Sequence, residues 1–418
     1  MMPINVETFM LLMCALLIFW KATGLTCFTA GLVRARNTND ILAKNVVLFA
    51  ITVLFFIPVT QSIIFSHGIN AYVPSFRHDL IKNSSTSLFQ QATTLFEMLI
   101  ALIPLYIITG ATAERLRFWP FLLFSLFYLG VIYPVVAYWT WGNGFLHTVG
   151  FIDYGGAAVL HISGAVAALA ALIYLGVRQG HYDEQKKTIA QPGANIPFAM
   201  LGAMQIWFGS IGLNVGTALL NAPQGLLMAH VSLVIINTMI AGSAGLIGAL
   251  IITRIVYGTI DVTLLFNGAL AGIVALSANP LLMQPSVVVL IGFVAGIITM
   301  LSLKACNRLR IDDPIGAVSV HGAGGLWGIL AVSFSLAYLP VQNQTSLFYG
   351  HNGQFLLQLL GVVCIIAWVF VVSLLVWSII RFTVGLRIKP DDEFKGMDIL
   401  TCGMNAYPEF ITPGQEKS

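Results

Sequence analysis

The sequence predicts an all-α polytopic membrane protein, and three observations support this. Hydrophobic residues make up 58% of the 418 residues and charged residues only 9%, against about 25% charged residues in soluble domains. The apolar residues form long segments, many near the ~20 residues that cross a bilayer as a helix. Lys and Arg collect in alternate connections between these segments, as in membrane proteins of fixed orientation. Such a chain leaves no room for a separate soluble domain.

Eleven apolar segments are predicted to be transmembrane helices. They are arranged as five helices, five more of opposite sense, and one additional helix, an inverted-repeat plan known from transporters. Residues 1–382 would form this eleven-helix domain, and residues 383–418 a charged cytoplasmic tail. The predicted segments are 7–33, 43–65, 88–113, 119–140 and 153–176, then 197–213, 225–253, 261–278, 285–305 and 316–338, and finally 354–381.

The basic residues indicate which side of the membrane each connection faces. One set of loops holds only Arg77 and Lys82, and Lys21 lies within the first segment. Almost all other Lys and Arg residues fall in the alternate loops and the tail. Because basic loops remain cytoplasmic, we predict an outer N-terminus and a cytoplasmic C-terminus in the plasma (inner) membrane. The net charge of +3 is then a topology signal, and no nucleic-acid partner is expected.

Two histidines stand out because each follows an aspartate at the same spacing within an apolar segment. His161 follows Asp153, and His321 follows Asp313, each by eight positions. Ionisable residues inside a membrane are costly and usually functional. The alternative to a functional site is that the two histidines are structural, with their polar atoms satisfied by hydrogen bonds between helices. The repeated spacing favours an internal duplication that builds one shared site.

The two aspartates are each expected to cap the start of a helix. A carboxylate is favoured there by the free backbone N–H groups and by the helix dipole. Asp153 would begin its helix at the outer face and Asp313 at the inner face. Eight helical residues rise ~12 Å, which would bring His161 and His321 towards each other from opposite faces.

At these residues the chain resembles the ammonium transporter/Rh family (Amt/Mep/Rh). The resemblance extends from about residue 20 to residue 407, so no single short motif carries it. The matching stretches are GLVRARN at 31–37, GATAERLRF at 110–118, the Asp-to-His segment at 153–161, NIPFAMLG at 195–202, GLNVGTAL at 212–219, NGALAGIVA at 267–275, DDPIGAVSVHGAGGLWG at 312–328 and GLRIKPDDEFKGMD at 385–398.

The resemblance implies a homotrimer of eleven-helix protomers in the lipid bilayer, each with a narrow pore for ammonium or ammonia. His161 and His321 match the twin histidines of that pore, and Asp153 a buried structural aspartate. Trp141 and Thr217 match the outer ammonium-binding vestibule, although Thr217 stands where the family usually has serine. The family also implies a PII-type protein as a cytoplasmic partner.

The residue chemistry agrees with ammonium as the ligand. An indole face attracts a small cation by ~0.5–2 kcal/mol, and a hydroxyl accepts a hydrogen bond from its N–H groups. Neutral imidazoles donate to or accept from ammonia, and a buried pair can share a proton. Deprotonation before entry avoids the large cost of moving a charge through apolar surroundings.

The sequence also departs from the family pattern. The gate positions, usually aromatic, are Ile100 and Leu213, with Phe96 one turn before Ile100. The family's FYGG reads Phe-Thr-Ala-Gly at 28–31, and its tail HGE reads Cys-Gly-Met at 402–404. These changes put conduction and PII binding in doubt, rather than ammonium recognition.

Glu97 and Lys21 are two further departures, since Glu97 replaces a usual glutamine and Lys21 is a charge within the first segment. Opposite buried charges are less costly as a pair, so one hypothesis is that the two residues pair or are bridged by polar groups. The alternative is that Lys21 extends towards the membrane surface and Glu97 faces the aqueous vestibule.

Three classes of function remain after these observations. The leading one is an ammonium transporter, and its alternative is an ammonium sensor with little or no conduction that signals through the C-terminus or a fused cytoplasmic module. An intramembrane enzyme is disfavoured, because the histidines have no nucleophile or carboxylate partner at motif spacing. No cofactor and no metal site are predicted.

Overall fold

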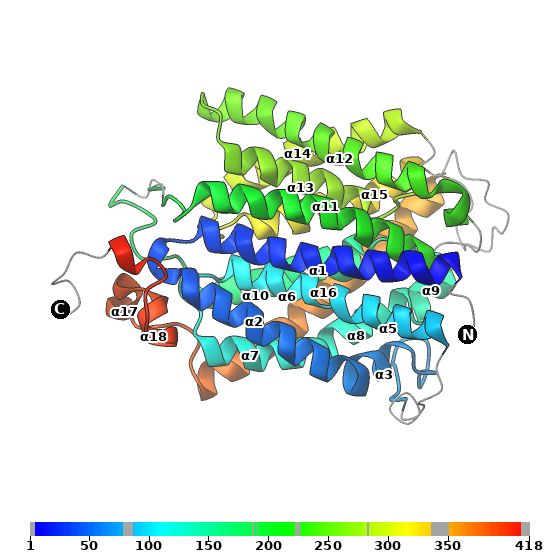
Figure 1. The fold of residues 1–418 in the computed structure, drawn as a ribbon, viewed down its shortest axis with the longest axis horizontal. Coiled ribbons are helices and arrows are strands. Elements are labelled where there is room, and N and C mark those ends of the chain that lie inside the picture. The colour runs from blue at the N-terminus through cyan, green and yellow to red at the C-terminus, as the bar shows by residue number, and fades with distance from the viewer. Residues whose placement is uncertain are drawn as a thin grey trace.

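The structure is a computed structural model that describes residues 5–77, 87–185, 188–189, 191–221, 226–281, 284–335 and 351–410. Long helices lie side by side with their axes roughly parallel, forming a bundle (Figure 1). Over these residues the secondary structure is helical, apart from two isolated β-bridges. The predicted all-α membrane fold is therefore confirmed.

The chain up to residue 175 forms one run of helices, several of them interrupted by π-helical turns labelled η. These elements are α1 (Val6–Leu32), η1 (Ala35–Asn37, a 3-10 turn), α2 (Thr38–Phe55), η2 (Phe56–Gln61), α3 (Ser62–Ile64), α5 (Leu88–Ile100), α6 (Leu102–Ala111), α7 (Phe118–Phe127), η3 (Tyr128–Ile132), α8 (Tyr133–Thr140), α9 (Phe145–Val149), η4 (Ala157–Ile162) and α10 (Ser163–Leu175).

The second part of the chain continues in the same way and ends in short tail helices. Its elements are α11 (Ile196–Asn221), α12 (Leu226–Tyr257), α13 (Val262–Leu276), α14 (Pro285–Arg308), η5 (Val318–Ala323), α15 (Gly324–Ser335), α16 (His351–Thr383), α17 (Pro390–Lys395), α18 (Met397–Cys402) and the 3-10 turn η7 (Pro408–Phe410).

Nine helical stretches in the described part of the chain are long and apolar enough to cross a membrane. Two shorter apolar helices, Val262–Leu276 and Val318–Phe334, fall on two of the remaining predicted segments. Each predicted segment therefore meets a helix, whereas the count of eleven membrane crossings remains a prediction.

The segment predicted at 197–213 ends too early. Helix α11 continues to Asn221, so Thr217 lies inside the helix. The Thr217 hydroxyl donates to the Leu213 carbonyl at 2.6 Å, and the Asn221 amide donates to the Thr217 carbonyl at 3.0 Å. Polar side chains thus bond to the helix's own backbone, and their polarity does not mark its end.

Helices α1 and α11 approach each other closely through glycines. A Cβ built on Gly202 would lie 2.4 Å from the Phe28 nitrogen, and one on Gly209 would lie 2.5 Å from the Lys21 Cβ. Small residues allow such close backbone contact between membrane helices. This packing fixes the Lys21 side chain against α11.

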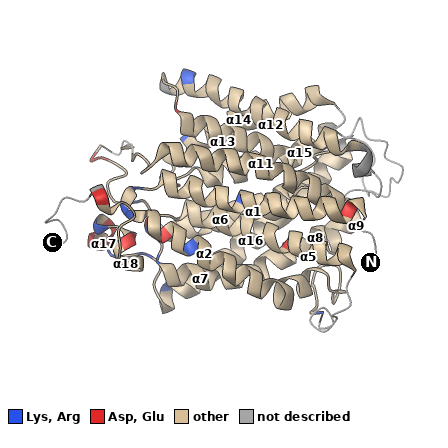
Figure 2. Ribbon diagram, in the orientation of Figure 1, with Lys and Arg blue, Asp and Glu red and all other residues tan. Residues whose placement is uncertain are grey.

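Charged residues gather at the end of the bundle that carries α17 and α18 (Figure 2). The tail docks there on the start of α2. The Met397 backbone N–H donates to Asn37 at 2.9 Å, and the Asp40 backbone N–H donates to the Asp398 carboxylate at 2.9 Å. The tail is therefore part of the folded structure as far as it is described.

Candidate functional site

His161 and His321 form a stacked pair between the helices. Their ring centroids are 5.0 Å apart and the rings are 9° from parallel. Both are buried, His161 in η4 and His321 in η5. Three ring nitrogens have no hydrogen-bond partner among the described residues: Nδ1 and Nε2 of His161, and Nδ1 of His321. Buried polar atoms normally have partners, so these nitrogens are available to a small polar ligand.

A carboxylate caps each histidine-bearing turn at the same distance along the chain. The Asp153 Oδ2 accepts from the N–H groups of Ala158 and Val159, at 2.9 and 3.0 Å. The Asp313 Oδ2 accepts from the Val318 N–H at 2.6 Å. The capping predicted from sequence is present at both sites. It satisfies N–H groups that the start of each helix leaves free and so holds both turns in place.

Trp141 lies over the beginning of η4. It ends α8, and its indole Nε1 donates to the Asp153 carbonyl at 3.0 Å. A Cβ built on Gly156, whose φ is +82°, would lie 3.2 Å from the Trp141 ring. The half-buried indole is therefore held by the same loop that carries the capping carboxylate, on the Asp153 side of the histidine pair.

Leu213 of the proposed gate and Thr217 of the proposed vestibule both lie on α11. Leu213 and Thr217 are both fully buried and joined by the hydroxyl-to-carbonyl bond of the same helix. Phe96 on α5 is buried against Gly216 of α11, where an added Cβ would lie 2.3 Å from the Phe96 ring. Ile100, one turn further along α5, is also buried. Phe96, Ile100 and Leu213 all belong to the buried apolar core of the bundle.

Lys21 and Glu97 do not form the ion pair considered from the sequence. None of the ion pairs between described residues joins them. Glu97 instead approaches the Gln61 amide, at 3.5 Å. Lys21 is 2% exposed, and its Cβ lies 2.5 Å from the position of a Cβ built on Gly209 of α11. The two unusual charges thus belong to different surroundings.

Several polar side chains near the site were not identified from the sequence. Asn214 on α11 donates to Thr238 on α12 at 3.0 Å and accepts from Ser277 at 2.9 Å. The Ser277 carbonyl in turn accepts from the Gly155 N–H at 2.7 Å, so this chain of contacts supports the loop after Asp153. The only sequence signal for these residues was their polarity within apolar segments.

A buried ionic network lies at the tail end of the bundle. Arg178 binds Asp312 at 2.8 Å and Glu114 at 3.3 Å, and Arg34 binds Glu114 at 2.6 Å. Burial acts to raise the pKa of Asp312, but the Arg115 and Arg178 guanidiniums outweigh it and hold that pKa well below its usual range. The network connects the loops that follow α1, α6, α10 and α14.

The tail connects to the loops of that network. The Arg387 guanidinium donates to the Leu175 and Val177 carbonyls at 2.6 and 2.7 Å. Glu393 binds Arg387 at 2.7 Å and accepts from the Gln179 N–H at 2.7 Å. A displacement of the loop after α10 would therefore also displace the tail residues bound to it.

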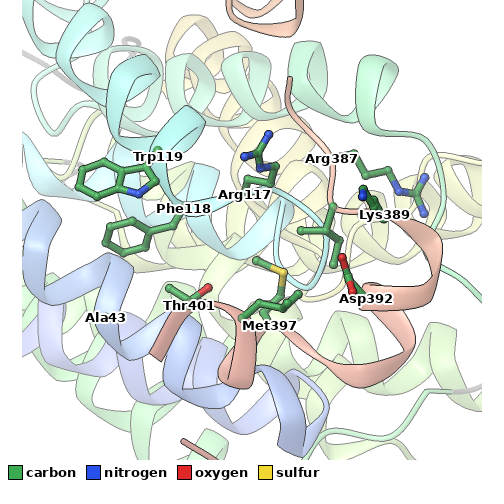
Figure 3. Close-up of a pocket in the computed structure, with 11 residues that line it drawn as sticks. Ala43, Arg117, Phe118, Trp119, Arg387, Lys389, Asp392, Met397 and Thr401 are labelled. Atoms are coloured by element: carbon green, nitrogen blue, oxygen red, sulfur yellow. The ribbon is translucent and has the colours of Figure 1, made fainter. Parts of the chain in front are cut away.

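A surface hollow lies at the tail. It has a volume of about 500 Å³ and lies between the tail, α2 and the start of α7, with Trp119, Met397 and Asp392 among its walls (Figure 3). A surface hollow of this kind is open to solvent, so the stacked imidazoles mark the candidate site better than cavity size does. Within the described residues, no group of His, Cys, Asp and Glu side chains is arranged to hold a metal ion.

Long apolar helices around a buried pair of imidazoles define an integral membrane protein with a polar site inside its helical bundle. The particular family follows from comparison with known proteins. The family model of the Ammonium Transporter Family matches residues 8–407, and this chain belongs to that family.

Known ammonium transporters are similar in sequence to nearly the whole of this chain. Ammonium transporter Amt2 of Archaeoglobus fulgidus is 32% identical over 96% of this chain and 88% of its own length. The ammonium transporter of Bacillus subtilis is 30% identical over 96% of this chain and 98% of its own length. These relatives are transporters and not enzymes, so the intramembrane enzyme is excluded.

Solved structures share the fold. A structure titled Sensor Amt Protein has a TM-score of 0.87 and 30% identity, covering 95% of this chain and 98% of that one. Mep2 of Candida albicans has a TM-score of 0.80 at 22% identity, covering 99% of this chain and 92% of that one. At that identity the Mep2 likeness concerns the fold alone.

Proposed function

We propose that this protein conducts ammonium or ammonia through a pore lined by the twin histidines. The observation that carries the proposal is the stacked, buried pair of His161 and His321 with unpartnered nitrogens. A neutral imidazole both donates and accepts hydrogen bonds, so the pair suits a small ligand with N–H groups and a lone pair.

The other site residues take roles along one path. Trp141 and Thr217 form the outer vestibule, where the indole face attracts the cation. Ile100, Leu213 and Phe96 form an apolar gate that excludes water. Asp153 and Asp313 have a structural role, since the Oδ2 of each carboxylate accepts from the backbone at the start of the histidine-bearing turn. Deprotonation at the vestibule would let the nitrogen cross the gate without its charge.

The same proposal includes the assembly and its placement. The protein is a homotrimer in the plasma (inner) membrane, with the N-terminus outside and the tail cytoplasmic. The charged end of the bundle, which carries the tail, supports this orientation, because basic loops remain inside. A PII-type protein is one candidate partner of that cytoplasmic end, although the family's HGE reads Cys-Gly-Met at 402–404.

A second candidate function is an ammonium sensor. The observation in its favour is the likeness to the structure titled Sensor Amt Protein, at 30% identity over 95% of the chain. In this reading the vestibule captures ammonium, and the contacts of Arg387 and Glu393 carry a shift of the inner loops to the tail or to a fused module. Binding drives such a shift only through different affinities for two states.

Uptake and binding measured on one preparation separate the two functions. Radiolabelled methylammonium uptake into proteoliposomes is compared with uptake into protein-free vesicles, and ammonium binding is measured by calorimetry. Transport predicts saturable, protein-dependent uptake that unlabelled ammonium inhibits. Saturable binding without uptake would reject transport in favour of sensing, and the absence of both would reject either function.

A further inference from the structure

The hollow at the tail is a cavity that the proposed transport path does not use. Its volume of about 500 Å³ is within the range of ligand pockets, ~300–1,000 Å³. The start of α7 and the tail after α16 form two of its walls. The Arg117 N–H donates to the Leu386 carbonyl at 2.9 Å, and the Ile388 N–H donates to the Arg115 carbonyl at 3.2 Å. The Arg117 guanidinium also donates to the Val384 carbonyl, at 2.8 Å. These bonds hold the two walls together.

The charged side chains that line the hollow are three cations and one carboxylate. Arg387 is neutralised by the buried Glu393, at 2.7 Å. The other two cations, Arg117 and Lys389, are exposed and form no ion pair with a described residue. Asp392 is the carboxylate among the described wall residues, and no ion pair between described residues includes it. The walls therefore carry an excess of one positive charge.

This excess of charge fits a phosphodiester better than a free phosphate. A phosphodiester carries a single negative charge, whereas a phosphate monoester carries about −1.5 to −2 at neutral pH. The guanidinium of Arg117 has five N–H donors, of which the bond to the Val384 carbonyl uses one. The remaining donors can bind phosphate oxygens in the paired geometry that arginine favours. The Lys389 ammonium group can add a further bond from the tail.

A strip of exposed apolar side chains on α7 begins at the hollow. Trp119, Leu123 and Phe127 are all exposed, and their spacing of four residues places them on one face of the helix. Helix α7 begins the stretch Phe118–Val149, which is long and apolar enough to cross a membrane, so this strip faces the lipid. Trp119 lines the hollow, and Figure 3 shows Arg117 between it and Lys389. Tryptophan is common at this level, where the bilayer meets water.

We propose that the hollow binds the headgroup of an anionic phospholipid. The phosphate lies on Arg117 and Lys389, and the acyl chains follow the strip formed by Trp119, Leu123 and Phe127. Basic pockets beside membrane helices recognise anionic headgroups in this way. Because α7 carries Arg117 at its start and the tail carries Lys389, one bound lipid joins the tail to the bundle. The inference goes beyond the proposed function and holds whether the protein conducts or senses ammonium.

Native mass spectrometry of the full chain purified in detergent tests this, because it resolves individual bound lipids and gives their dissociation constants. The probes are dioleoyl phosphatidylglycerol, dioleoyl phosphatidylcholine with the same acyl chains, and glycerol 3-phosphate as a soluble competitor. The variants are Lys389→Gln, Lys389→Arg and Arg117→Gln/Lys389→Gln. The matched control is Arg308→Gln/Lys395→Gln, which removes the same charge from exposed positions outside the hollow. Gel filtration shows whether each variant assembles as the wild type does.

Wild type should bind phosphatidylglycerol about tenfold or more tightly than phosphatidylcholine, since each nearby Lys or Arg strengthens binding about fivefold. Lys389→Gln should lose about fivefold in affinity for phosphatidylglycerol, and Arg117→Gln/Lys389→Gln about tenfold or more. Lys389→Arg and the matched control should bind as wild type does. If the double variant fails to assemble, the two Lys389 variants decide, because Lys389 forms no ion pair with a described residue.

Three results would overturn the lipid site. Unchanged affinity in Lys389→Gln, or an equal loss in the matched control, would mean that the hollow does not bind the headgroup. Equal affinity for phosphatidylcholine would mean that the charge of the lipid is not recognised. Displacement of phosphatidylglycerol by an equal concentration of glycerol 3-phosphate would assign the hollow to a soluble phosphate.

Discussion

The indole Nε1 of Trp141 donates to the backbone carbonyl of Asp153 at 3.0 Å, and the Asp153 side chain caps the turn that carries His161. The proposed ammonium-binding aromatic and the nearer histidine are therefore positioned by one short loop. A displacement of that loop would move both side chains, which links the proposed capture at Trp141 to the proposed passage at His161.

Removal of the Trp141 ring should weaken ammonium capture. Trp141→Leu loses the cation–π attraction of ~0.5–2 kcal/mol, so we expect the KM of methylammonium uptake to rise about 2- to 30-fold. The matched control is Trp119→Leu on α7, because Trp119 is 68% exposed on the surface of the bundle. An unchanged KM in Trp141→Leu would show that the indole does not bind the cation.

Gly216 should be intolerant of a side chain because Phe96 occupies the space beside it. A Cβ at Gly216 would lie 2.3 Å from the Phe96 ring, whereas one at Gly130 would lie 3.5 Å from Phe55. Overpacking typically costs about 1–3 kcal/mol. We expect Gly216→Ala to lower the melting temperature and to reduce uptake, and Gly130→Ala to do neither. Equal behaviour of the two variants would contradict the tight gate packing.

Loss of the Asp153 carboxylate should destabilise the protein more than loss of an exposed cap. Asp153→Ala leaves the Ala158 and Val159 N–H groups buried without an acceptor, which adds to a cap contribution of about 1 kcal/mol. Asp261 caps α13 through the Thr263 N–H at 2.8 Å but is exposed. Thermal unfolding in detergent should show the larger loss for Asp153→Ala, and the reverse order would count against the buried cap.

The Asp312 network predicts a specific loss of stability in acid. Its folded pKa lies below its usual range because of Arg115 and Arg178. A depressed pKa gives stability that is complete above the unfolded value of about 3.9 and is lost as pH falls through the folded value. The melting temperature of the wild type should therefore decrease at pH values below about 4. The Asp312→Asn variant should lack the part of this decrease that comes from protonation of Asp312. Identical acid profiles for the two proteins would contradict the assignment.

Glu393 is predicted to hold the tail on the bundle. Glu393→Gln removes the charge that binds Arg387 and weakens the acceptor of the Gln179 N–H. Limited proteolysis should then cut the tail faster by about fivefold or more, since a charged hydrogen bond contributes ~1.5–3 kcal/mol. Lys395→Gln, at an exposed position of the same helix, serves as the control. Equal cleavage rates would show that the tail is held by other contacts.

The sequence predicted the histidine pair because its signal was local and repeated. The spacing from Asp153 to His161 recurs from Asp313 to His321, and helix rise alone brings the two imidazoles together. The capping by both aspartates was predictable for the same reason. The α-helical class followed from composition, since only helices and closed barrels satisfy a backbone in lipid.

The remaining contacts depend on packing between segments far apart in the chain. Lys21 packs against α11 because glycines such as Gly209 let α1 approach that helix, and no pattern within 7–33 encodes that. The pairing of Lys21 with Glu97 was considered from charge alone and is not present. The extension of α11 past Leu213 was missed because Thr217 and Asn221 bond to their own helix.

The most direct test of the proposed pore is methylammonium uptake by the His161→Ala/His321→Ala variant in proteoliposomes. The stacked pair is proposed to line the passage, so its removal should reduce protein-dependent uptake at least about tenfold. Gel filtration should show that the variant assembles as the wild type does. Uptake equal to that of wild type in an assembled double variant would contradict the account, because ammonium would then cross without the histidines.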